Sequence, residues 1–267
     1  MIQYGKESEF FRTEIMKLGA QLYTVRKYTQ NEADYELTFK TLKEMGYENV
    51  QLSGGFAIDP HKLMELSEKY SLPIVCTHVS FDRIVNDTDA LIKEHKIYGC
   101  PVIGIGSMPK EFRGTKKGLE DFLAAMDTPV KKILDAGLGF SYHNHDFEFK
   151  PLEDGSIAYD IMLERCPDWK FLADTYWIEF AGYSAIDYIA KIGRERLTNV
   201  HFKDMANDEK RSICACGQGT LDFVAIYGQC VKFGVENVLV EQDNAANLGD
   251  PFDQMKLSFD HLRPVIK

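Results

Sequence analysis

The 267-residue sequence lacks several features that would assign it to common classes of protein. No apolar run approaches the roughly 18 residues that a membrane-spanning helix needs. Basic residues are fewer than acidic ones, 31 against 41, and the formal net charge is -10. This balance disfavours a nucleic-acid partner, because no excess of lysine and arginine is present to replace the counterions of the phosphate backbone. We therefore expect neither a membrane nor a nucleic acid as partner, and a small polar molecule fits better.

Cysteine is sparse, and its spacing is uninformative. The six cysteines match neither a disulfide framework nor a paired Cys-x-x-Cys zinc site, so we interpret them as reduced thiols. Residues 1–13 are too charged for the apolar core of a signal peptide. Both observations predict a cytoplasmic protein.

What the sequence does contain is a regular alternation of strand-like and helix-like segments. The strand-like runs lie at 18–25, 50–52, 72–79, 102–105, 141–149, 169–174, 196–203 and 237–241. A segment of helical periodicity follows each of them, with no linker or break in composition. Such alternation requires a parallel sheet, and eight repeats favour a closed (β/α)8 TIM barrel.

We therefore predict a single-domain α/β barrel over residues 17–267, preceded by an N-terminal extension over residues 1–16. An open, doubly wound sheet is the alternative fold. It is disfavoured because no Gly-x-Gly-x-x-Gly follows the first strand.

Imidazoles and carboxylates gather at the ends of the last four predicted strands. In an extended strand alternate side chains share a face, so His143 and His145 should point the same way and can bind a divalent metal. The next three strands end on Asp174, His201 and Glu241. Because the C-terminal ends of barrel strands carry the chemistry, we predict that these residues bind one divalent ion: manganese, zinc, cobalt or magnesium.

A divalent ion at this position suits the chemistry of a sugar carbonyl. It can stabilise the enediolate that forms when a proton next to the carbonyl is removed. Glu148, Lys203 and the second histidine of the fifth strand are the candidates for proton transfer. Trp177 is predicted to line the sugar ring, although a core tryptophan fits the sequence equally well. The predicted contacts for substrate hydroxyls are His78, Gln21, Tyr23 and Gln51.

Five segments of the sequence together resemble one known family. They are residues 18–26, 142–149, 174–177, 201–204 and 240–243. They are similar to the sugar phosphate isomerase/epimerase superfamily, or xylose isomerase-like TIM barrels, over residues 17–265. The resemblance implies a metal held in the pattern Glu, Asp, His, Glu, of which Asp174, His201 and Glu241 match the last three. It also implies a homodimer that pairs through the loops of the barrel rim.

The chain departs from the ketose epimerases of that family at two positions. The fifth strand offers His143 or His145 where those enzymes place a glutamate that also acts as acid and base. Trp177 stands where they tend to have a substrate-binding histidine. Both the two-glutamate mechanism and the substrate contacts are therefore expected to differ here.

The resulting expectation is a metal-dependent sugar isomerase or epimerase of carbohydrate metabolism. The close alternative is a keto-sugar lyase or hydratase, because β-elimination passes through the same enediolate. An apurinic endonuclease has the same barrel, but it needs further metal-binding histidines and a basic groove. The last alternative is a non-catalytic sugar-binding barrel, which would bind metal without exchanging a proton.

Overall fold

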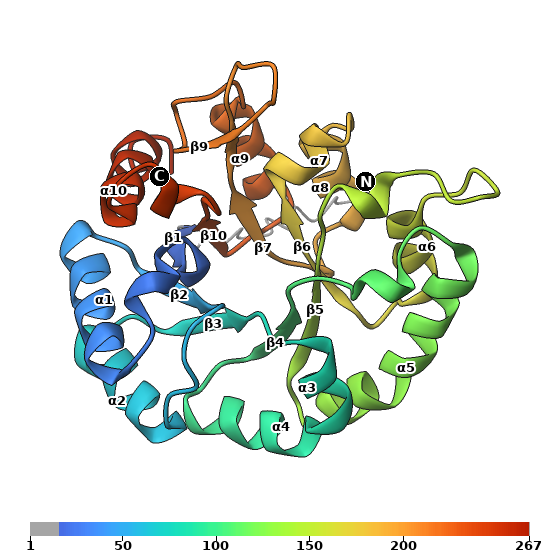
Figure 1. The fold of residues 1–267 in the computed structure, drawn as a ribbon, viewed down its shortest axis with the longest axis horizontal. Coiled ribbons are helices and arrows are strands. Elements are labelled where there is room, and N and C mark those ends of the chain that lie inside the picture. The colour runs from blue at the N-terminus through green and yellow to red at the C-terminus, as the bar shows by residue number, and fades with distance from the viewer. Residues whose placement is uncertain (1–15, 267) are drawn as a thin grey trace, which may run out of the picture.

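The computed structural model describes residues 16–266, and eight parallel strands form its centre (Figure 1). They are β1 (Lys17–Gln21), β2 (Asn49–Leu52), β3 (Ile74–Thr77), β4 (Val102–Ile105), β5 (Gly139–His143), β6 (Lys170–Asp174), β7 (Leu197–Phe202) and β10 (Asn237–Val240). The strands pair in the order β3-β2-β1-β10-β7-β6-β5-β4. A bridge between Val79 and Ile105 joins the two ends of the sheet. The predicted (β/α)8 barrel is therefore confirmed.

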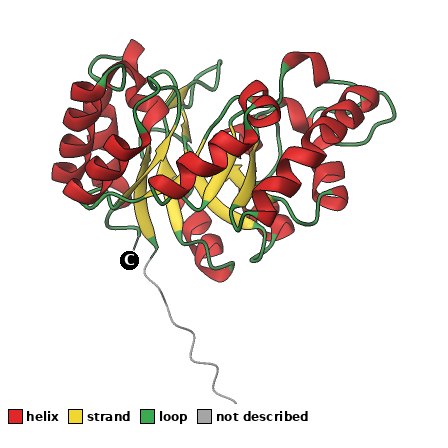
Figure 2. Ribbon diagram, turned by 90° about the horizontal axis from the view of Figure 1, so that it is seen from below, coloured by secondary structure: helices red, strands yellow, loops and turns green. Residues whose placement is uncertain are grey.

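Helices surround the barrel and flank the strands in the perpendicular view (Figures 1 and 2). They are α1 (Glu32–Met45), α2 (Pro60–Tyr70), α3 (Phe81–Asn86), α4 (Thr88–Ile97), α5 (Lys116–Asp135), α6 (Ala158–Arg165), α7 (Thr175–Phe180), α8 (Ala185–Ile192), α9 (Phe223–Lys232) and α10 (Pro251–Leu262). Short 3-10 helices cover Leu22–Tyr28, Lys110–Phe112, Phe147–Phe149 and Ala245–Asn247. A two-stranded hairpin, β8 (Asp204–Met205) with β9 (Ile213–Cys214), lies after β7.

Local sequence explains where the first helices begin and end. The side chain of Asn31 accepts a hydrogen bond from the backbone N–H of Asp34 and caps α1. Gly46 ends that helix in the left-handed region, with φ of 104°, where a side chain would be strained. Asp59 caps α2, and Pro60 occupies its first turn. Each helix then buries its apolar face against the strands.

Several predicted strands are shorter than expected, and β1 and β5 are two that end next to the candidate site. β1 ends at Gln21 because the Gln21 side chain accepts the backbone N–H of Tyr23 and starts a 3-10 helix. β5 ends at His143, and Asp146 already has helical backbone angles. The prediction of an extended strand over residues 141–149 is therefore wrong beyond His143.

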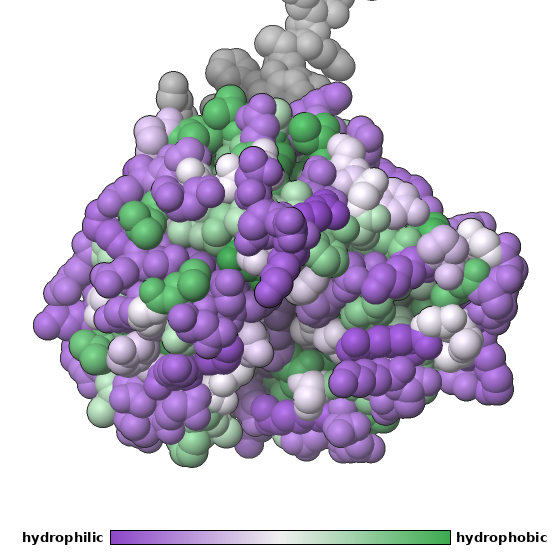
Figure 3. Space-filling view, turned by 45° about the horizontal axis from the view of Figure 1, so that its top comes forward, coloured by the Kyte–Doolittle hydropathy of each residue, from purple (hydrophilic) through white to green (hydrophobic). Residues whose placement is uncertain are grey.

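One face of the surface is predominantly hydrophilic, and apolar residues occur on it singly or in small groups (Figure 3). Within residues 16–266, none of the helices has both the length and the apolar character to cross a membrane. The predicted N-terminal extension, residues 1–16, lies outside the described residues except for Met16. That domain boundary and the cytoplasmic location stay predictions.

Candidate active site

Four predicted metal ligands meet at the C-terminal ends of adjacent strands. His143 ends β5, Asp174 ends β6, His201 lies in β7, and Glu241 directly follows β10. All four are buried, and their candidate ligand atoms lie within 4.8 Å of one another. His201 Nδ1 is 2.9 Å from Glu241 Oε2, and His143 Nε2 is 3.3 Å from Asp174 Oδ2. Two imidazoles and two carboxylates at this spacing form a donor set for one divalent ion.

The second ring nitrogen of each histidine bonds outside this cluster. His143 Nδ1 lies 3.0 Å from the carbonyl oxygen of Gly106, and His201 Nε2 lies 2.6 Å from Gln51 Oε1. An amide oxygen only accepts, so these nitrogens carry the protons. In neutral rings His143 Nε2 and His201 Nδ1 then face the carboxylates with lone pairs, and His201 Nδ1 is buried without a hydrogen-bond partner. These residues therefore fit a shared metal cation.

The side chain of Lys203 is buried against the same carboxylates. Its Nζ lies 2.9 Å from Asp174 Oδ2, 2.7 Å from Glu241 Oε2 and 3.2 Å from Asp243 Oδ2. Burial alone would lower the pKa of Lys203, but the three carboxylates raise that pKa well above its usual value. Burial would likewise raise the pKa of Asp174 and Glu241, yet Lys203 holds each pKa well below its usual value. The site is therefore charged, with carboxylates in excess of the ammonium.

His145 and Trp177 lie beside the cluster but are not part of it. The His145 ring centroid is 4.8 Å from that of His143 and 5.2 Å from that of Trp177. His145 Nδ1 and Trp177 Nε1 are buried and have no hydrogen-bond partner. Lys203 Nζ lies 5.4 Å from the Trp177 ring. Of the two candidate histidines after the fifth strand, only His143 joins the four-residue cluster, while His145 and Trp177 form an adjacent wall.

Glu148, a predicted group for proton transfer, is not a member of the four-residue cluster. Its Oε1 accepts a hydrogen bond from the Tyr142 hydroxyl at 2.7 Å, and its Oε2 accepts the backbone N–H of His145 at 2.8 Å. Tyr142 alternates with His143 along β5 and so faces away from the barrel interior. Glu148 therefore supports the turn that carries His145. Burial raises the pKa of its carboxyl to about 7.

His78 directly follows β3 and lies next to His143 and His201. Its ring centroid is 4.8 Å from that of His143 and 5.6 Å from that of His201. Burial, together with those two histidines, lowers the pKa of His78 well below its usual value. A pocket of about 390 Å³, lined in part by His78 and Gly106, opens beside it. The predicted substrate-binding residue thus lies between the cluster and a cavity.

Asp204 holds the long segment that follows β7. Asp204 is fully buried, and its carboxylate accepts four backbone N–H groups. The four donors are Met205, Gly217, Gly219 and Leu221, at 2.8 to 3.1 Å. Asn244 Nδ2 adds a hydrogen bond to the carbonyl of Ile213. The segment that follows Lys203 is therefore fixed in place. The aspartate followed by two closely spaced glycines was the available signal.

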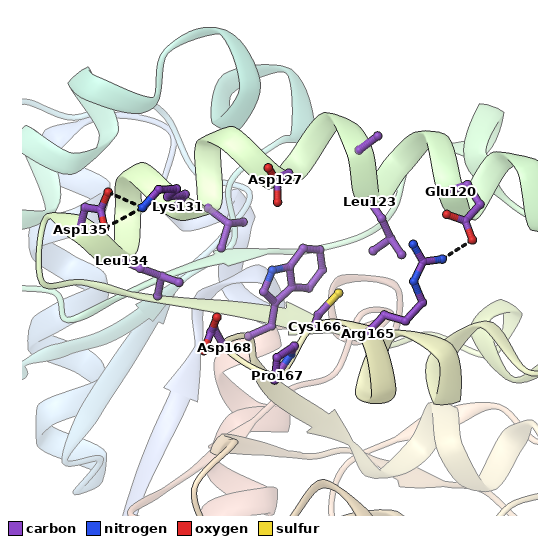
Figure 4. A pocket seen from close by; sticks show the side chains of 13 residues that line it. Glu120, Leu123, Asp127, Lys131, Leu134, Asp135, Arg165, Cys166, Pro167 and Asp168 are labelled. Carbon is purple, nitrogen blue, oxygen red and sulfur yellow. Dashed lines mark hydrogen bonds and ion pairs between the residues drawn. The ribbon is translucent and has the colours of Figure 1, made fainter.

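A wider groove of about 950 Å³ lies elsewhere, between α5 and the segment before β6 (Figure 4). Its charged side chains are partly paired with one another, as in Glu120 with Arg165 and Lys131 with Asp135. It holds no member of the histidine and carboxylate cluster. Size alone therefore does not identify the reactive site, and we place the chemistry at the cluster.

Comparisons with known proteins agree with this fold. No family model and no curated protein sequence matches the chain. A sugar phosphate isomerase/epimerase from Parabacteroides distasonis matches with a TM-score of 0.75 at 21% identity, covering 94% of this chain and 100% of the other. The IOLI protein with a bound zinc atom matches with a TM-score of 0.73 at 12% identity, covering 94% and 98%.

A third solved structure is a probable 3-DHS dehydratase, AsbF, from Bacillus anthracis. It matches with a TM-score of 0.73 at 12% identity, covering 93% of this chain and 99% of the other. The likeness that the sequence motifs predicted is confirmed at the level of architecture: the chain has the barrel fold of the sugar phosphate isomerase/epimerases and xylose isomerase-like proteins.

Proposed function

We propose that the protein is a metal-dependent enzyme that isomerises or epimerises a sugar by proton abstraction next to its carbonyl. The observation that carries the proposal is the convergence of His143, Asp174, His201 and Glu241, in which one ring nitrogen of each histidine faces a carboxylate. When bound, a divalent ion would supply the positive charge that stabilises an enediolate. Manganese, zinc, cobalt and magnesium are all compatible with this donor set.

The chain's own residues then account for binding and proton transfer. Lys203 is a buried cation beside Asp174 and Glu241, placed to give a proton or a hydrogen bond to a substrate oxygen. His145 has a free Nδ1 next to the cluster and is the group that takes the proton from carbon. Trp177 and His78 bind the sugar from opposite sides. Glu148 has no part in the chemical step.

Elimination from a keto-sugar is the second candidate reaction. It is supported by the similarity to the probable dehydratase from Bacillus anthracis and by the enediolate that both reactions share. The apurinic endonuclease alternative receives less support. It needs additional metal-binding histidines, whereas residues 16–266 contain one group of three or more clustered donors, suited to one ion. Pairing into a homodimer stays a prediction from the family resemblance.

Incubation of candidate sugars in heavy water tests the proposed step. Free ketoses, sugar phosphates and keto-glycosides are screened with the protein and each of the four metals. We expect metal-dependent uptake of deuterium next to the carbonyl of one substrate class. The mass of the product then distinguishes the two reactions. Isomerisation changes the mass only by the deuterium taken up, whereas elimination also removes a leaving group.

Two matched variants make this experiment specific to the cluster. Glu241→Gln removes one ligand charge and should abolish exchange, whereas Asp127→Asn changes an exposed carboxylate of the distant groove and should not. Metal binding without deuterium uptake by any sugar would contradict the proposal that the protein is an enzyme, and would favour the non-catalytic sugar-binding barrel.

A further inference from the structure

Two buried glutamines each contact one histidine of the site. Gln21 ends β1, and Gln51 lies in β2. Gln21 Nε2 lies 3.3 Å from His78 Nδ1, whereas Gln51 Oε1 lies 2.6 Å from His201 Nε2. The first glutamine thus presents its donor end to a histidine, and the second presents its acceptor end.

A second contact fixes the orientation of the Gln21 amide. Gln21 Oε1 accepts the backbone N–H of Tyr23 at 3.1 Å. Because a backbone N–H can only donate, the NH₂ group of Gln21 must face His78. The amide of Gln51 lies beside the Cys76 thiol, but its Nε2 is buried without a hydrogen-bond partner. The oxygen of Gln51 faces His201 Nε2 at 2.6 Å.

These contacts require opposite tautomers of the two histidines. His78 Nδ1 accepts from Gln21, so the proton of that ring resides on Nε2, which is buried without a partner. His201 Nε2 donates to Gln51, so in the neutral ring that a metal requires the lone pair resides on Nδ1. That Nδ1 lies 2.9 Å from Glu241 Oε2 and 3.4 Å from Asp174 Oδ2. One ring offers a donor to the site, and the other offers a metal ligand.

Two glycines of the fourth strand and its loop make room for the donor histidine. A Cβ atom on Gly106 would lie 3.1 Å from His78 Cβ, and one on Gly104 would lie 2.3 Å from the carbonyl oxygen of Thr77. A larger residue at either position would displace the segment that carries His78. The close approach brings the His78 ring beside His143, over the side of the cluster that faces the 390 Å³ pocket.

We propose that Gln21 and Gln51 are positioning residues that assign opposite roles to two histidines. Through Gln21, His78 donates a hydrogen bond from Nε2 to a substrate oxygen, and through Gln51, His201 gives Nδ1 to the metal. The role of His78 as a donor to substrate rests on the proposed function. The role of His201 as a ligand through Nδ1 requires only that a metal binds.

Side-chain nitrogen spectra of histidine-labelled, zinc-loaded protein read the tautomers directly. We expect His78 to be protonated on Nε2, and His201 to be protonated on Nε2 with zinc on Nδ1. His78 protonated on Nδ1, or His201 bound through Nε2, would overturn the assignment. This readout does not depend on any substrate.

Substitution of each glutamine separates the two roles. Gln51→Met should weaken zinc binding by about 10- to 100-fold, as loss of the partner of a ligand histidine typically does. Gln51→Glu keeps an oxygen that accepts from His201 and should restore the affinity. Gln21→Met should leave zinc affinity unchanged and lower kcat for deuterium exchange, up to the roughly 100-fold cost of losing one oxyanion donor. Gln229→Met, on α9, is the matched control.

A merely structural role would give a different pattern. Both methionine variants would then lose thermal stability without separating zinc affinity from kcat, and Gln51→Glu would bring no rescue. Wild-type zinc affinity in Gln51→Met would also contradict the proposal. If wild-type protein exchanges hydrogen on no sugar, the proposed function fails, while the tautomers and the zinc affinities still decide this inference.

Discussion

The Nζ of Lys203 lies 2.7 Å from Glu241 Oε2, and both side chains are buried. The same ammonium lies 2.9 Å from Asp174 Oδ2. Lys203 is thus a counterion for two of the carboxylates that are proposed to bind metal. A divalent cation at these carboxylates shares them with the ammonium, so the stability of the protein and its metal affinity should be linked through this one residue.

The substitution Lys203→Met tests that link. In metal-free protein it leaves buried carboxylates without their cation, and removal of one partner of a buried pair costs about 3–5 kcal/mol. We expect a lower free energy of unfolding in the presence of a chelator, and a larger gain on adding zinc than in wild type. Chemical denaturation with and without metal measures both. Lys131→Met, which removes an exposed lysine paired with Asp135, is the control. Equal zinc stabilisation in wild type and Lys203→Met would contradict the link.

Glu148→Gln tests whether that glutamate supports the turn or takes part in proton transfer. The amide replaces one acceptor oxygen by a donor, so either the Tyr142 hydroxyl or the His145 backbone N–H loses its partner. An unsatisfied buried group costs about 1–3 kcal/mol. We expect a less stable protein with unchanged zinc affinity, measured by thermal unfolding and titration calorimetry. Unchanged stability together with a large loss of deuterium exchange would return Glu148 to the chemistry.

Asp204→Asn should loosen the segment that follows Lys203. The amide keeps only one acceptor for the four N–H groups that the carboxylate receives in the native protein. Loss of hydrogen bonds to a buried charge costs about 1.5–3 kcal/mol each, although rearrangement recovers part of it. Hydrogen–deuterium exchange should become faster at residues 205–221. Protection equal to that of wild type at these residues would show that the Asp204 carboxylate does not hold the segment.

We expect His95 to contribute to the free energy of unfolding at neutral pH, and this contribution to be lost in acid. It is buried between the Thr77 hydroxyl, at 2.9 Å, and the Leu91 carbonyl, at 2.8 Å, and the charged groups near it are Arg83 and Glu94. Burial lowers its pKa from 6.5 to about 4, although the Leu91 carbonyl opposes that shift. A histidine with a lowered folded pKa stabilises the fold above the unfolded pKa, and this stabilisation is lost as the pH falls from 6.5 towards 4.

The linkage relation gives the size of this effect. Between pH 7 and pH 5 the contribution of His95 should fall by about 2 kcal/mol. His95→Gln should therefore flatten the fall in the free energy of unfolding over that range, measured by urea denaturation at both values. His61→Gln, which changes an exposed histidine of α2, should leave that fall unchanged. Parallel pH profiles for wild type and His95→Gln would refute the assignment.

Hydrophobic periodicity predicted the barrel because each strand and helix has a buried face of its own. Residues 102–105 were predicted as a strand with the bounds that the structure shows. The short helices α3 and α7 were missed, since six residues carry too little periodicity. Their caps were visible all the same: Ser80 and Asp174 each accept a backbone N–H three residues later.

The sequence predicted those site residues whose place in the barrel depends only on their position along a strand. Asp174, His201 and Glu241 follow from strand ends, because parallel strands of a barrel end on one rim. Contacts between distant residues were not predictable. The bond between Gln51 and His201 spans 150 positions, and no local pattern shows that Gln51 would reach a histidine and not a substrate. The contacts of Glu148 with Tyr142 and His145 were not predictable either, because residue types alone do not show the turn after His143.

The central claim is that His143, Asp174, His201 and Glu241 hold a divalent ion that the chemistry requires. The most direct measurement is deuterium uptake by a responsive sugar in heavy water, recorded with metal content for wild type, Asp174→Asn and Asp127→Asn. We predict about one ion per chain and metal-dependent uptake in wild type and Asp127→Asn, with both lost in Asp174→Asn. Full metal content and undiminished uptake in Asp174→Asn would contradict the account.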